Sequence, residues 1–576
     1  MSKLNIKMGK IPCEEAGGVS VKVISSLEKI FPYKKPSFEI QTASILKNER
    51  LNFQLVVFSD KHVMDGRIDV EGELAKYVTI FSEDYVAVTN ETSRWPAHDD
   101  YRINNEREMG IYPDVLRPID AYKRIFKKNV YTPFWVSVDT KGEVPNGKYF
   151  VGFKFFDEND ALLSETKFEI EILEESLAEE APYIMNWLHF DSICNTHRVR
   201  YLSNQFYKIF NEYLKNAVAH GMNVLFTPAL SVAVDSDIGV YRKDVQLLDI
   251  SETERGYEFD FTKLERFIDN AKALGIKKFC FSHIASQWGA KCAIRVRVNK
   301  NGKNIYKFGW NVPSDDEEYT KFLSQYLQAL DKYLDEKGLK EQVYLNISDE
   351  TSMENSSNYE RLSKLIRENS RGIKILDTTG ESYYIDNELM DVPVISSDKY
   401  SEISPKKDCW VYYCCAQRSD YLSNRFINMP SQRNRVLGFQ LYLNNVKGFL
   451  HWGYNFYAGY LSRQSLNPYV VNDGMGLFEA GDCFMVYPTE KGCVDSLRNA
   501  VFYDAIQDYR ALKTLEKYIG RNKVIEILDS EGLKGFTEYP RDMYWHINFR
   551  EKINRMIIDS IQVNSSKAKE AISGEK

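Results

Sequence analysis

The sequence predicts a (β/α)8 barrel that is preceded by an N-terminal β-sandwich and followed by C-terminal helices. Two patterns along the 576 residues support this fold class. Up to about residue 178, short strand-like segments follow one another without helical periodicity, which is typical of a sandwich. Beyond residue 180, amphipathic helices alternate with short apolar strands, which is typical of a parallel barrel. We therefore expect domains at residues 1–178 and 179–565, with a polar tail at 566–576.

The N-terminal segment contains several short runs that suit strands. The clearest are residues 53–58, 134–138 and 166–173, where apolar residues are frequent or alternate with polar ones. The sequence Pro-Asn-Gly at residues 145–147 is a turn signal between two such runs. The acidic segment 174–180 then forms a solvated connection to the predicted barrel.

Three amphipathic helices in the second segment carry apolar residues at helical spacing. The first two lie at residues 206–217 and 264–274, and a glycine follows each of them. The third opens with a capping box, Ser314 and Glu317, and closes before Gly338. Glycine suits the left-handed position that ends a helix, so each junction returns the chain to a strand.

The predicted barrel strands are eight short, mostly apolar segments: Tyr183–Leu188, Met222–Thr227, Lys278–His283, Val343–Ser348, Ile373–Thr378, Val392–Ser397, Cys409–Cys414 and Gly448–Gly453. Their spacing is irregular, because the gap between the sixth and seventh strands is too short for a full helix. Residues 228–262 and 284–313 are long insertions. An open, doubly wound sheet is therefore the alternative, although no glycine-rich phosphate loop follows any strand.

Composition excludes several classes of protein. The net charge of −7 argues against a dedicated nucleic-acid binder. No apolar run is long enough for a membrane span, and no secretory signal is visible. The nine cysteines are scattered without a Cys-x-x-Cys pair, so we expect reduced thiols in a cytoplasmic protein. No metal-ligand cluster or His-Glu-x-x-His motif is present, and we expect no cofactor.

Asp349 and Glu350 directly follow the fourth predicted strand, and they are the predicted catalytic residues. A solvated loop or a helix cap would explain most Asp-Glu pairs, but barrel enzymes place reacting groups at this end of a strand. Glycosidases need an acid that protonates the leaving oxygen. Adjacent residues suit the usual acid and nucleophile poorly, because those carboxyl groups lie about 5–5.5 Å apart across the scissile bond. They suit a substrate whose own 2-acetamido oxygen is the nucleophile.

Other polar and aromatic side chains near the strand ends are predicted to bind substrate: Trp187, His189, Asp191, His283, Asp377, Tyr412, Trp452 and Asn455. Aromatic rings stack well on the apolar faces of sugars. Core packing is an equally good explanation for each ring, and a structural role is equally good for both histidines. Asp377 could contact substrate or cap a helix. Arg498, which heads a helix, is expected only to pair with a carboxylate.

From about residue 180 to 515 the chain resembles glycoside hydrolase family 123, whose members are exo-acting β-N-acetylgalactosaminidases. The resemblance is carried by residues 344–350, which end in the Asp-Glu pair, by residues 410–412 with Asn424 and Arg435, and by three C-terminal segments. These segments are 448–455, 481–488 and 496–509. The N-terminal sandwich also fits the layout of this family.

The resemblance implies a substrate-assisted, retaining mechanism, with terminal β-GalNAc of glycans or glycosphingolipid headgroups as the substrate. Asp349 would polarise the acetamido group, and Glu350 would be the general acid and base. Trp452 would form the floor of the sugar site, and Tyr412 would hold the acetamido oxygen.

Two other functions stay open at this point. One is a glycosidase of different specificity, with Glu350 as the acid and a distant carboxylate such as Asp377 as the nucleophile. The other is a carbohydrate-binding protein without turnover, which the intact Asp349-Glu350 pair disfavours. Sequence alone does not separate GalNAc from GlcNAc, because that choice depends on a single hydroxyl contact, and it leaves the oligomeric state open.

Overall fold

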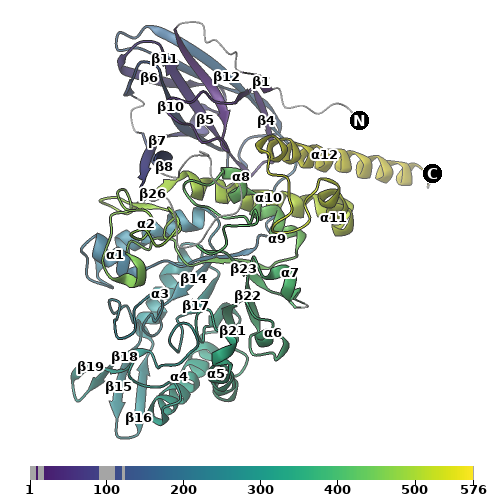
Figure 1. The fold of residues 1–576 in the computed structure, drawn as a ribbon. Coiled ribbons are helices and arrows are strands. Elements are labelled where there is room, and N and C mark those ends of the chain that lie inside the picture. Colours follow the sequence, from purple (N-terminus) through teal and green to yellow (C-terminus); the bar gives the residue numbers. More distant parts are fainter. Residues whose placement is uncertain (1–7, 11–17, 90–109, 120–122, 406, 575–576) are drawn as a thin grey trace.

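The computed structural model describes residues 8–10, 18–89, 110–119, 123–405 and 407–574. Figure 1 shows two packed sheets at one end of the molecule and a strand-and-helix body at the other. The long helix α10 (Leu497–Ile519) lies between them. This order of sandwich, barrel and C-terminal helices is the predicted fold class.

The sandwich consists of a seven-stranded and a five-stranded sheet. In spatial order the first contains β2 (Val19–Ser25), β5 (Arg50–Ser59), β10 (Val130–Asp139), β7 (Val78–Val88), β8 (Gly110–Pro118), β26 (Cys493–Ser496) and β25 (Tyr487–Pro488). The second contains β4 (Thr42–Ile45), β12 (Leu162–Ile172), β11 (Gly147–Phe156), β6 (Val63–Glu71) and β9 (Lys123–Phe126). A separate ladder pairs β1 (Met8–Lys10) with β3 (Phe38–Ile40).

The sandwich core lies between the two sheets. Phe53 contacts the rings of Phe153 and Phe168 across it, and all three are fully buried. The strand pairs are antiparallel apart from β4, which runs parallel to β12. The larger sheet is completed from far along the chain, because β26 pairs with β8. The sandwich and the barrel are therefore joined by more than the acidic connection.

Eight parallel strands form the barrel, and each matches a predicted strand within two or three residues. In spatial order they are β13 (Tyr183–Asn186), β24 (Gly448–His451), β23 (Trp410–Tyr412), β22 (Val392–Ser396), β21 (Lys374–Thr379), β20 (Val343–Leu345), β17 (Lys278–Phe281) and β14 (Val224–Thr227). The first and last strands are linked where Asn223 N donates to Ile184 O at 3.1 Å. The nearly closed barrel, and not the open sheet, is therefore the fold.

The barrel helices differ in length: α1 (Phe190–Thr196), α2 (Asn204–Ala219), α3 (Thr262–Ala273), α4 (Glu317–Glu336), α5 (Ser356–Asn369), α6 (Tyr383–Asp386), α7 (Tyr400–Ile403), α8 (Ser431–Arg435) and α9 (Leu437–Leu443). The four-residue α7 fills the short gap between the sixth and seventh strands. The predicted capping box of α4 is wrong. Asp316 caps this helix by accepting from Tyr319 N, while Ser314 accepts a hydrogen bond from Arg361.

The two long insertions fold against each other. They contribute β15 (Asp249–Thr253), β16 (Gly256–Asp260), β18 (Arg295–Lys300) and β19 (Lys303–Phe308), which pair in the order β16-β15-β18-β19. Figure 1 shows this small sheet at the end of the molecule opposite the sandwich. The rest of each insertion consists of loops that follow β14 and β17 at the C-terminal end of the barrel.

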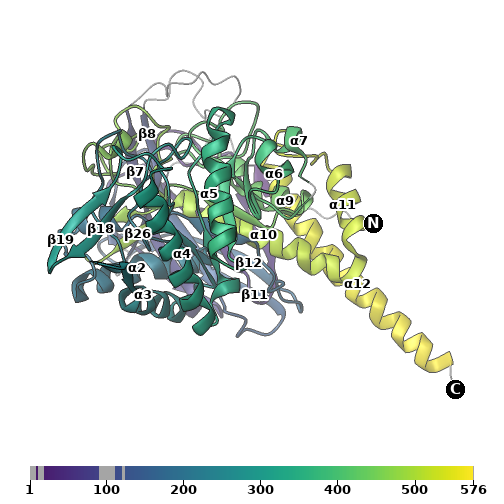
Figure 2. The ribbon, with the colours of Figure 1, turned by 90° about the horizontal axis from the view of Figure 1, so that it is seen from below.

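Three helices end the chain: α10, α11 (Arg521–Ser530) and α12 (Met543–Gly574). The last helix continues through the segment for which a polar tail was expected, and its end projects away from the rest of the molecule in Figures 1 and 2. Figure 2 also shows α4 and α5 side by side on the outside of the barrel.

A buried ion pair joins α10 to the sandwich. Arg498 Nε donates to Asp114 Oδ1 at 2.9 Å, and its Nη2 donates to Asp114 Oδ2 at 3.0 Å. Both side chains are at most 2% exposed. The sequence-based expectation that Arg498 pairs with a carboxylate is therefore confirmed, and its partner comes from β8.

We expect Arg498→Met to lower the free energy of unfolding by about 3–5 kcal/mol, because Asp114 would stay buried without its partner. Chemical and thermal unfolding of the purified protein would measure this loss. The matched control is Arg117→Met, since Arg117 is a half-exposed partner of Asp84 from the same strand as Asp114. Exposed pairs contribute about 0–1 kcal/mol. Equal losses in the two variants would contradict the role of the buried pair.

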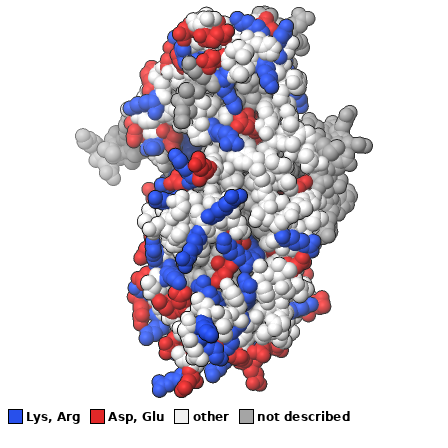
Figure 3. Space-filling model, turned by 90° about the vertical axis from the view of Figure 1, so that its left-hand side faces the viewer, with Lys and Arg blue, Asp and Glu red and all other residues white. Residues whose placement is uncertain are grey.

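Charged groups are spread over the surface. On the face shown in Figure 3, acidic and basic side chains are interspersed from one end of the molecule to the other. Among the helices that the structure describes, none has the length and apolar character of a membrane span.

Candidate active site

A cavity of about 190 Å³ opens at the C-terminal end of the barrel. It is lined by residues from the ends of seven of the eight strands or from the loops that follow them: Trp187, His189, Val234, Asp235, Gln287, Trp288, Asp349, Glu350, Thr378, Tyr412, Cys414, Cys415, Leu450, Trp452, Tyr460 and Phe478. Both predicted catalytic residues are among them. So are four of the eight predicted substrate-binding residues, namely Trp187, His189, Tyr412 and Trp452.

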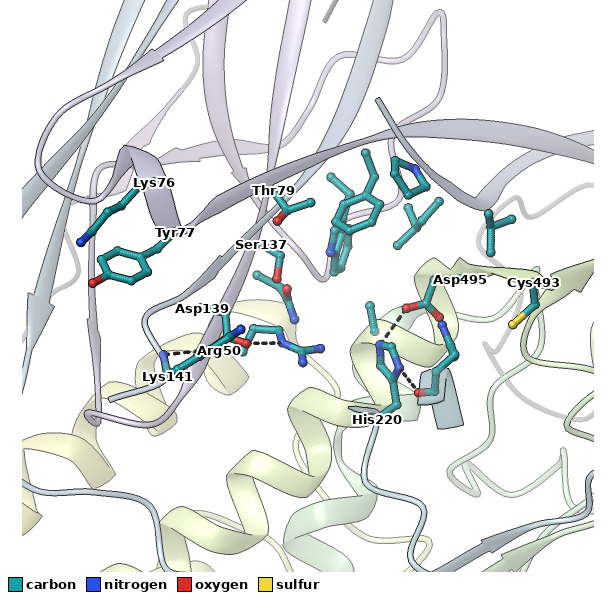
Figure 4. Close-up of a pocket in the computed structure, with 18 of the residues that line it drawn as sticks. Arg50, Lys76, Tyr77, Thr79, Ser137, Asp139, Lys141, His220, Cys493 and Asp495 are labelled. Atoms are coloured by element: carbon teal, nitrogen blue, oxygen red, sulfur yellow. Dashed lines mark hydrogen bonds and ion pairs between the residues drawn. The ribbon is translucent and has the colours of Figure 1, made fainter. Parts of the chain in front are cut away.

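A second and larger cavity, of about 620 Å³, lies between the sandwich and the barrel (Figure 4). Two acids that line it are paired, Asp139 with Arg50 at 3.6 Å and Asp495 with His220 at 2.7 Å. His220 comes just before β14, so this cavity is beside the N-terminal ends of the strands. Reacting groups of barrel enzymes lie at the opposite end. The smaller cavity is therefore the candidate active site.

The backbone of the catalytic pair is held by its neighbours. Thr378 Oγ1 donates to Asp349 Oδ1 at 3.0 Å and accepts from Glu350 N at 3.0 Å. Trp288 N donates to the carbonyl oxygen of Asp349 at 2.8 Å. Glu350 has a φ of 44°, a left-handed conformation that is unfavourable for a residue with a side chain. Such strain persists where the surroundings hold it, as these hydrogen bonds do.

The two carboxyl groups compete for protons. Burial raises the pKa of Asp349, and the nearby charges of Glu350 and Asp235 raise it further, against the hydrogen bond from Thr378. Burial also raises the pKa of Glu350, although Tyr412 Oη donates to its Oε1 at 3.0 Å. Because the groups titrate together, the raised pKa values belong to the pair. The pair therefore retains a proton to higher pH than an exposed carboxyl would, as a general acid requires.

A buried arginine fixes His189 at the edge of the cavity. Arg242 Nη2 lies 2.9 Å from His189 Nδ1, and His189 Nε2 lies 2.8 Å from Trp452 O. A guanidinium can only donate, so Nδ1 accepts and Nε2 carries the hydrogen. Burial and the charge of Arg242 lower the pKa of His189 to about 3, which keeps the ring neutral. Asp191 does not line the cavity and instead pairs with Arg242 at 2.7 Å.

Aromatic rings form the walls. Trp452 lies 5.0 Å from Phe456 and 5.1 Å from Phe478, and its Nε1 donates to Asp482 at 2.9 Å. Trp187 stacks on Phe226 with ring centroids 4.9 Å apart. Both indoles also line the cavity. Rings fixed in this way offer flat, apolar surfaces to the C–H faces of a sugar.

Asp377, His283 and Asn455 do not line the cavity. Asp377 Oδ2 accepts from Ile347 N at 2.8 Å and from Tyr359 Oη at 2.6 Å, so it holds the segment before Asp349. Burial raises its pKa well above the ordinary range.

Asn455 and His283 support the walls of the cavity. Asn455 Oδ1 accepts from the backbone N–H of His189 at 2.7 Å, and its Nδ2 donates to the carbonyl of His189 at 3.1 Å. His283 packs edge-on against Trp187, and burial lowers its pKa to about 3. These side chains therefore act on residues that line the cavity.

Asp235 is a third acid in the cavity that the sequence analysis did not identify. Burial raises its pKa to about 6, and its charge contributes to the raised pKa of Asp349. Its Oδ2 atom is buried and accepts no hydrogen bond from the residues that the structure describes. Asp235 lies in the irregular first insertion, where no periodicity marks it. Its position on a loop after a barrel strand was the one available signal.

A barrel whose strand ends bring two adjacent carboxyl groups between aromatic walls has the architecture of a glycoside hydrolase. The family model "Glycoside hydrolase 123, catalytic domain" matches residues 187–515, which is more than half of the chain. The protein therefore belongs to glycoside hydrolase family 123.

One solved structure agrees with this assignment at the level of the fold. A family 123 glycoside hydrolase from Clostridium perfringens, studied for glycolipid glycan hydrolysis, is 15% identical and has a TM-score of 0.72. The match covers 95% of this chain and 100% of that one. An endo-β-1,4-mannanase from Thermotoga petrophila is 12% identical over 58% of this chain and 77% of its own, with a TM-score of 0.32. No curated protein sequence matches.

Proposed function

We propose that the protein is a retaining exo-β-N-acetylgalactosaminidase that removes terminal β-GalNAc from glycans or glycolipid headgroups. The observation that carries this proposal is the direct adjacency of Asp349 and Glu350 inside one small cavity. Adjacent acids favour a nucleophile that belongs to the substrate. The glycolipid glycans of the Clostridium perfringens relative support the substrate class.

In the proposed reaction the 2-acetamido oxygen of the sugar attacks the anomeric carbon. The carboxylate of Asp349 accepts a hydrogen bond from the amide N–H and stabilises the positive charge that develops on the oxazolinium ring. Glu350 donates its proton to the leaving oxygen and then removes a proton from the water that opens the ring. Two displacements at the anomeric carbon retain its configuration.

Tyr412 has a choice of partner in this scheme. Its hydroxyl donates to Glu350 in the free protein. To hold the acetamido oxygen it must turn away from Glu350, which then gains freedom to reach the leaving group. The cavity volume of about 190 Å³ is below the roughly 300–1,000 Å³ of pockets for larger ligands, which suits one terminal sugar.

The alternative that uses Asp377 as a protein nucleophile has less support. Asp377 does not line the cavity, and the partners of its Oδ2 hold it against the protein. We also propose a reducing environment for the protein, since the eight cysteines in the described part of the chain are free thiols.

Three nitrophenyl glycosides test the proposed reaction. We expect rapid release of nitrophenol from the β-GalNAc glycoside and, because galactose lacks the acetamido nucleophile, at least 10³-fold slower release from the β-Gal glycoside. The β-GlcNAc glycoside measures the selectivity for the 4-hydroxyl group. Equal rates on β-Gal and β-GalNAc would overturn the substrate-assisted mechanism. They would instead favour a protein nucleophile, with Asp235 as the candidate. Sugar binding without any cleavage would support a binding protein.

A further inference from the structure

Exposed apolar side chains gather on the loops around the mouth of the cavity. Ile238 is 84% exposed, Met475 is 55% exposed and Trp288 is 47% exposed. They come from the loops that follow β14, β24 and β17. With Val240 and Met353, which are also exposed, we call these five residues the apolar rim. A set of this kind on one edge of a protein is typical of a contact surface.

Hydrogen bonds hold the loops of the rim together. Asp237, beside Ile238, accepts from Arg463 Nε at 2.8 Å. Gln464, the next residue after Arg463, donates to Met475 Sδ at 2.8 Å. The loops that carry Ile238 and Met475 are therefore linked through residues 463 and 464.

The same loops reach the cavity itself. Ser462 Oγ donates to the carbonyl oxygen of Asp235, at 2.7 Å, and Asp235 lines the cavity. Gln287 Nε2 donates to Ser236 O at 2.8 Å, which ties the loop of Trp288 to the loop of Ile238. The apolar rim is thus continuous with the wall of the sugar site.

Met475 lies in a strained turn of its loop. Gly474, Met475 and Gly476 have φ values of 59°, 70° and 80°. Glycine tolerates this left-handed region, but a side chain there is unfavourable. Ile238 is followed by Gly239, whose φ is 82°. Both tips expose an apolar side chain to water in a tight, glycine-containing turn, and neither side chain contributes to a core. Strain of this kind is typical of functional loops.

We propose that the apolar rim contacts the surface of the lipid bilayer that carries a glycolipid substrate, so that the protein acts on headgroups in place. This inference rests on the proposed function. When the terminal sugar of a glycolipid enters the cavity, its lipid chains remain in the bilayer, and the membrane surface faces the loops at the mouth. Apolar side chains there enter the interfacial region, and Trp288 suits the boundary between headgroups and chains.

Charge adds little to this contact. The net charge of −7 gives no general attraction to anionic lipids. Arg463, a basic residue beside the rim, is already paired with Asp237. We therefore expect binding to zwitterionic vesicles that persists at high salt.

The test compares one reaction on two forms of substrate. The rim variant is Ile238→Glu with Met475→Glu, because neither residue lines the cavity. The matched control is Met64→Glu with Ile125→Glu, which changes two residues of the sandwich with exposures of 58% and 57%. Each protein is assayed on nitrophenyl β-GalNAc and on a glycolipid with terminal β-GalNAc in phosphatidylcholine vesicles. Flotation with the same vesicles measures binding.

We expect the rim variant to lose at least tenfold in rate on vesicles and to lose vesicle binding, with an unchanged rate on the nitrophenyl glycoside. The control should match the original protein in all three measurements. Unchanged hydrolysis on vesicles would overturn the inference, as would equal losses on both substrates, which would indicate a sugar contact. Dissociation of a dimer without an effect on vesicles would identify the rim as a contact between copies and would also overturn it. Failure of the unaltered protein on every GalNAc glycoside would instead refute the proposed function.

Discussion

Glu350→Gln is expected to lower kcat/KM about 10²–10⁴-fold on GalNAc-terminated oligosaccharides, whose leaving groups are poor. Glutamine keeps the size of the side chain and an acceptor for Tyr412, but it has no proton to give to the leaving oxygen. A dinitrophenyl leaving group needs little protonation, so the loss on that substrate should be much smaller. Steady-state kinetics on the two substrates measure the difference. Full activity on the oligosaccharide would exclude Glu350 as the acid.

The dependence of this effect on pH follows from the proton that Asp349 and Glu350 share. The raised pKa values mean that the pair keeps its proton at neutral pH and loses it as the pH rises through the upper value. We expect kcat/KM of the original protein to fall on the alkaline side for this reason. With Glu350→Gln, this alkaline limb should disappear on dinitrophenyl β-GalNAc. An unchanged pH profile would place the essential proton on another group.

The barrel was predictable because its signal is local and repeated. Each strand is a short apolar run, and the helices α2, α3 and α4 carry an apolar face that packs on the barrel. Parallel strands place their C-terminal ends at one edge. The cavity could therefore be located from Asp349 and the residues around Trp187 and Trp452.

Assignments at single residues were harder, because a position near a strand end does not say which way a side chain points. Asp377 lies near the end of β21 and Tyr412 ends β23, yet only Tyr412 lines the cavity. Asp191 forms an ion pair with Arg242. Arg242 lies in the irregular first insertion, and no sequence periodicity connects it to the first strand. Long-range partners of this kind are not encoded in local spacing.

The remaining residues of the site lie in the insertions, where the sequence pattern did not predict their role. Asp235 and Trp288 lie in segments without regular structure, and both have positive φ values, 51° and 58°. Their conformations depend on the hydrogen bonds of the assembled mouth, such as that from Trp288 N to Asp349 O. The strands β25 and β26 of the sandwich were not predicted for a similar reason. Their place depends on a long-range contact, because β26 pairs with a strand that precedes it by more than 370 residues.

Asp349→Asn is expected to lower kcat on β-GalNAc substrates about 10²–10³-fold, the usual loss when one preorganised electrostatic contact to a transition state is removed. Asparagine can still accept from Thr378 Oγ1, so the backbone at the pair should stay in place. It cannot offset the positive charge of the oxazolinium ring. Because that charge develops only in the transition state, kcat should fall more than KM rises.

Stability distinguishes this effect from simple damage to the fold. Asp349 is a partly buried carboxyl beside two other acids, and its ionised form is destabilised by desolvation and by their charges. Replacing it with a neutral amide removes that repulsion, so the melting temperature of Asp349→Asn should equal or exceed that of the original protein at neutral pH. A loss of activity together with a lower melting temperature would indicate a structural role. Near-normal activity on β-GalNAc would exclude Asp349 as the group that orients the acetamide, and with it the substrate-assisted reaction built on the adjacent pair.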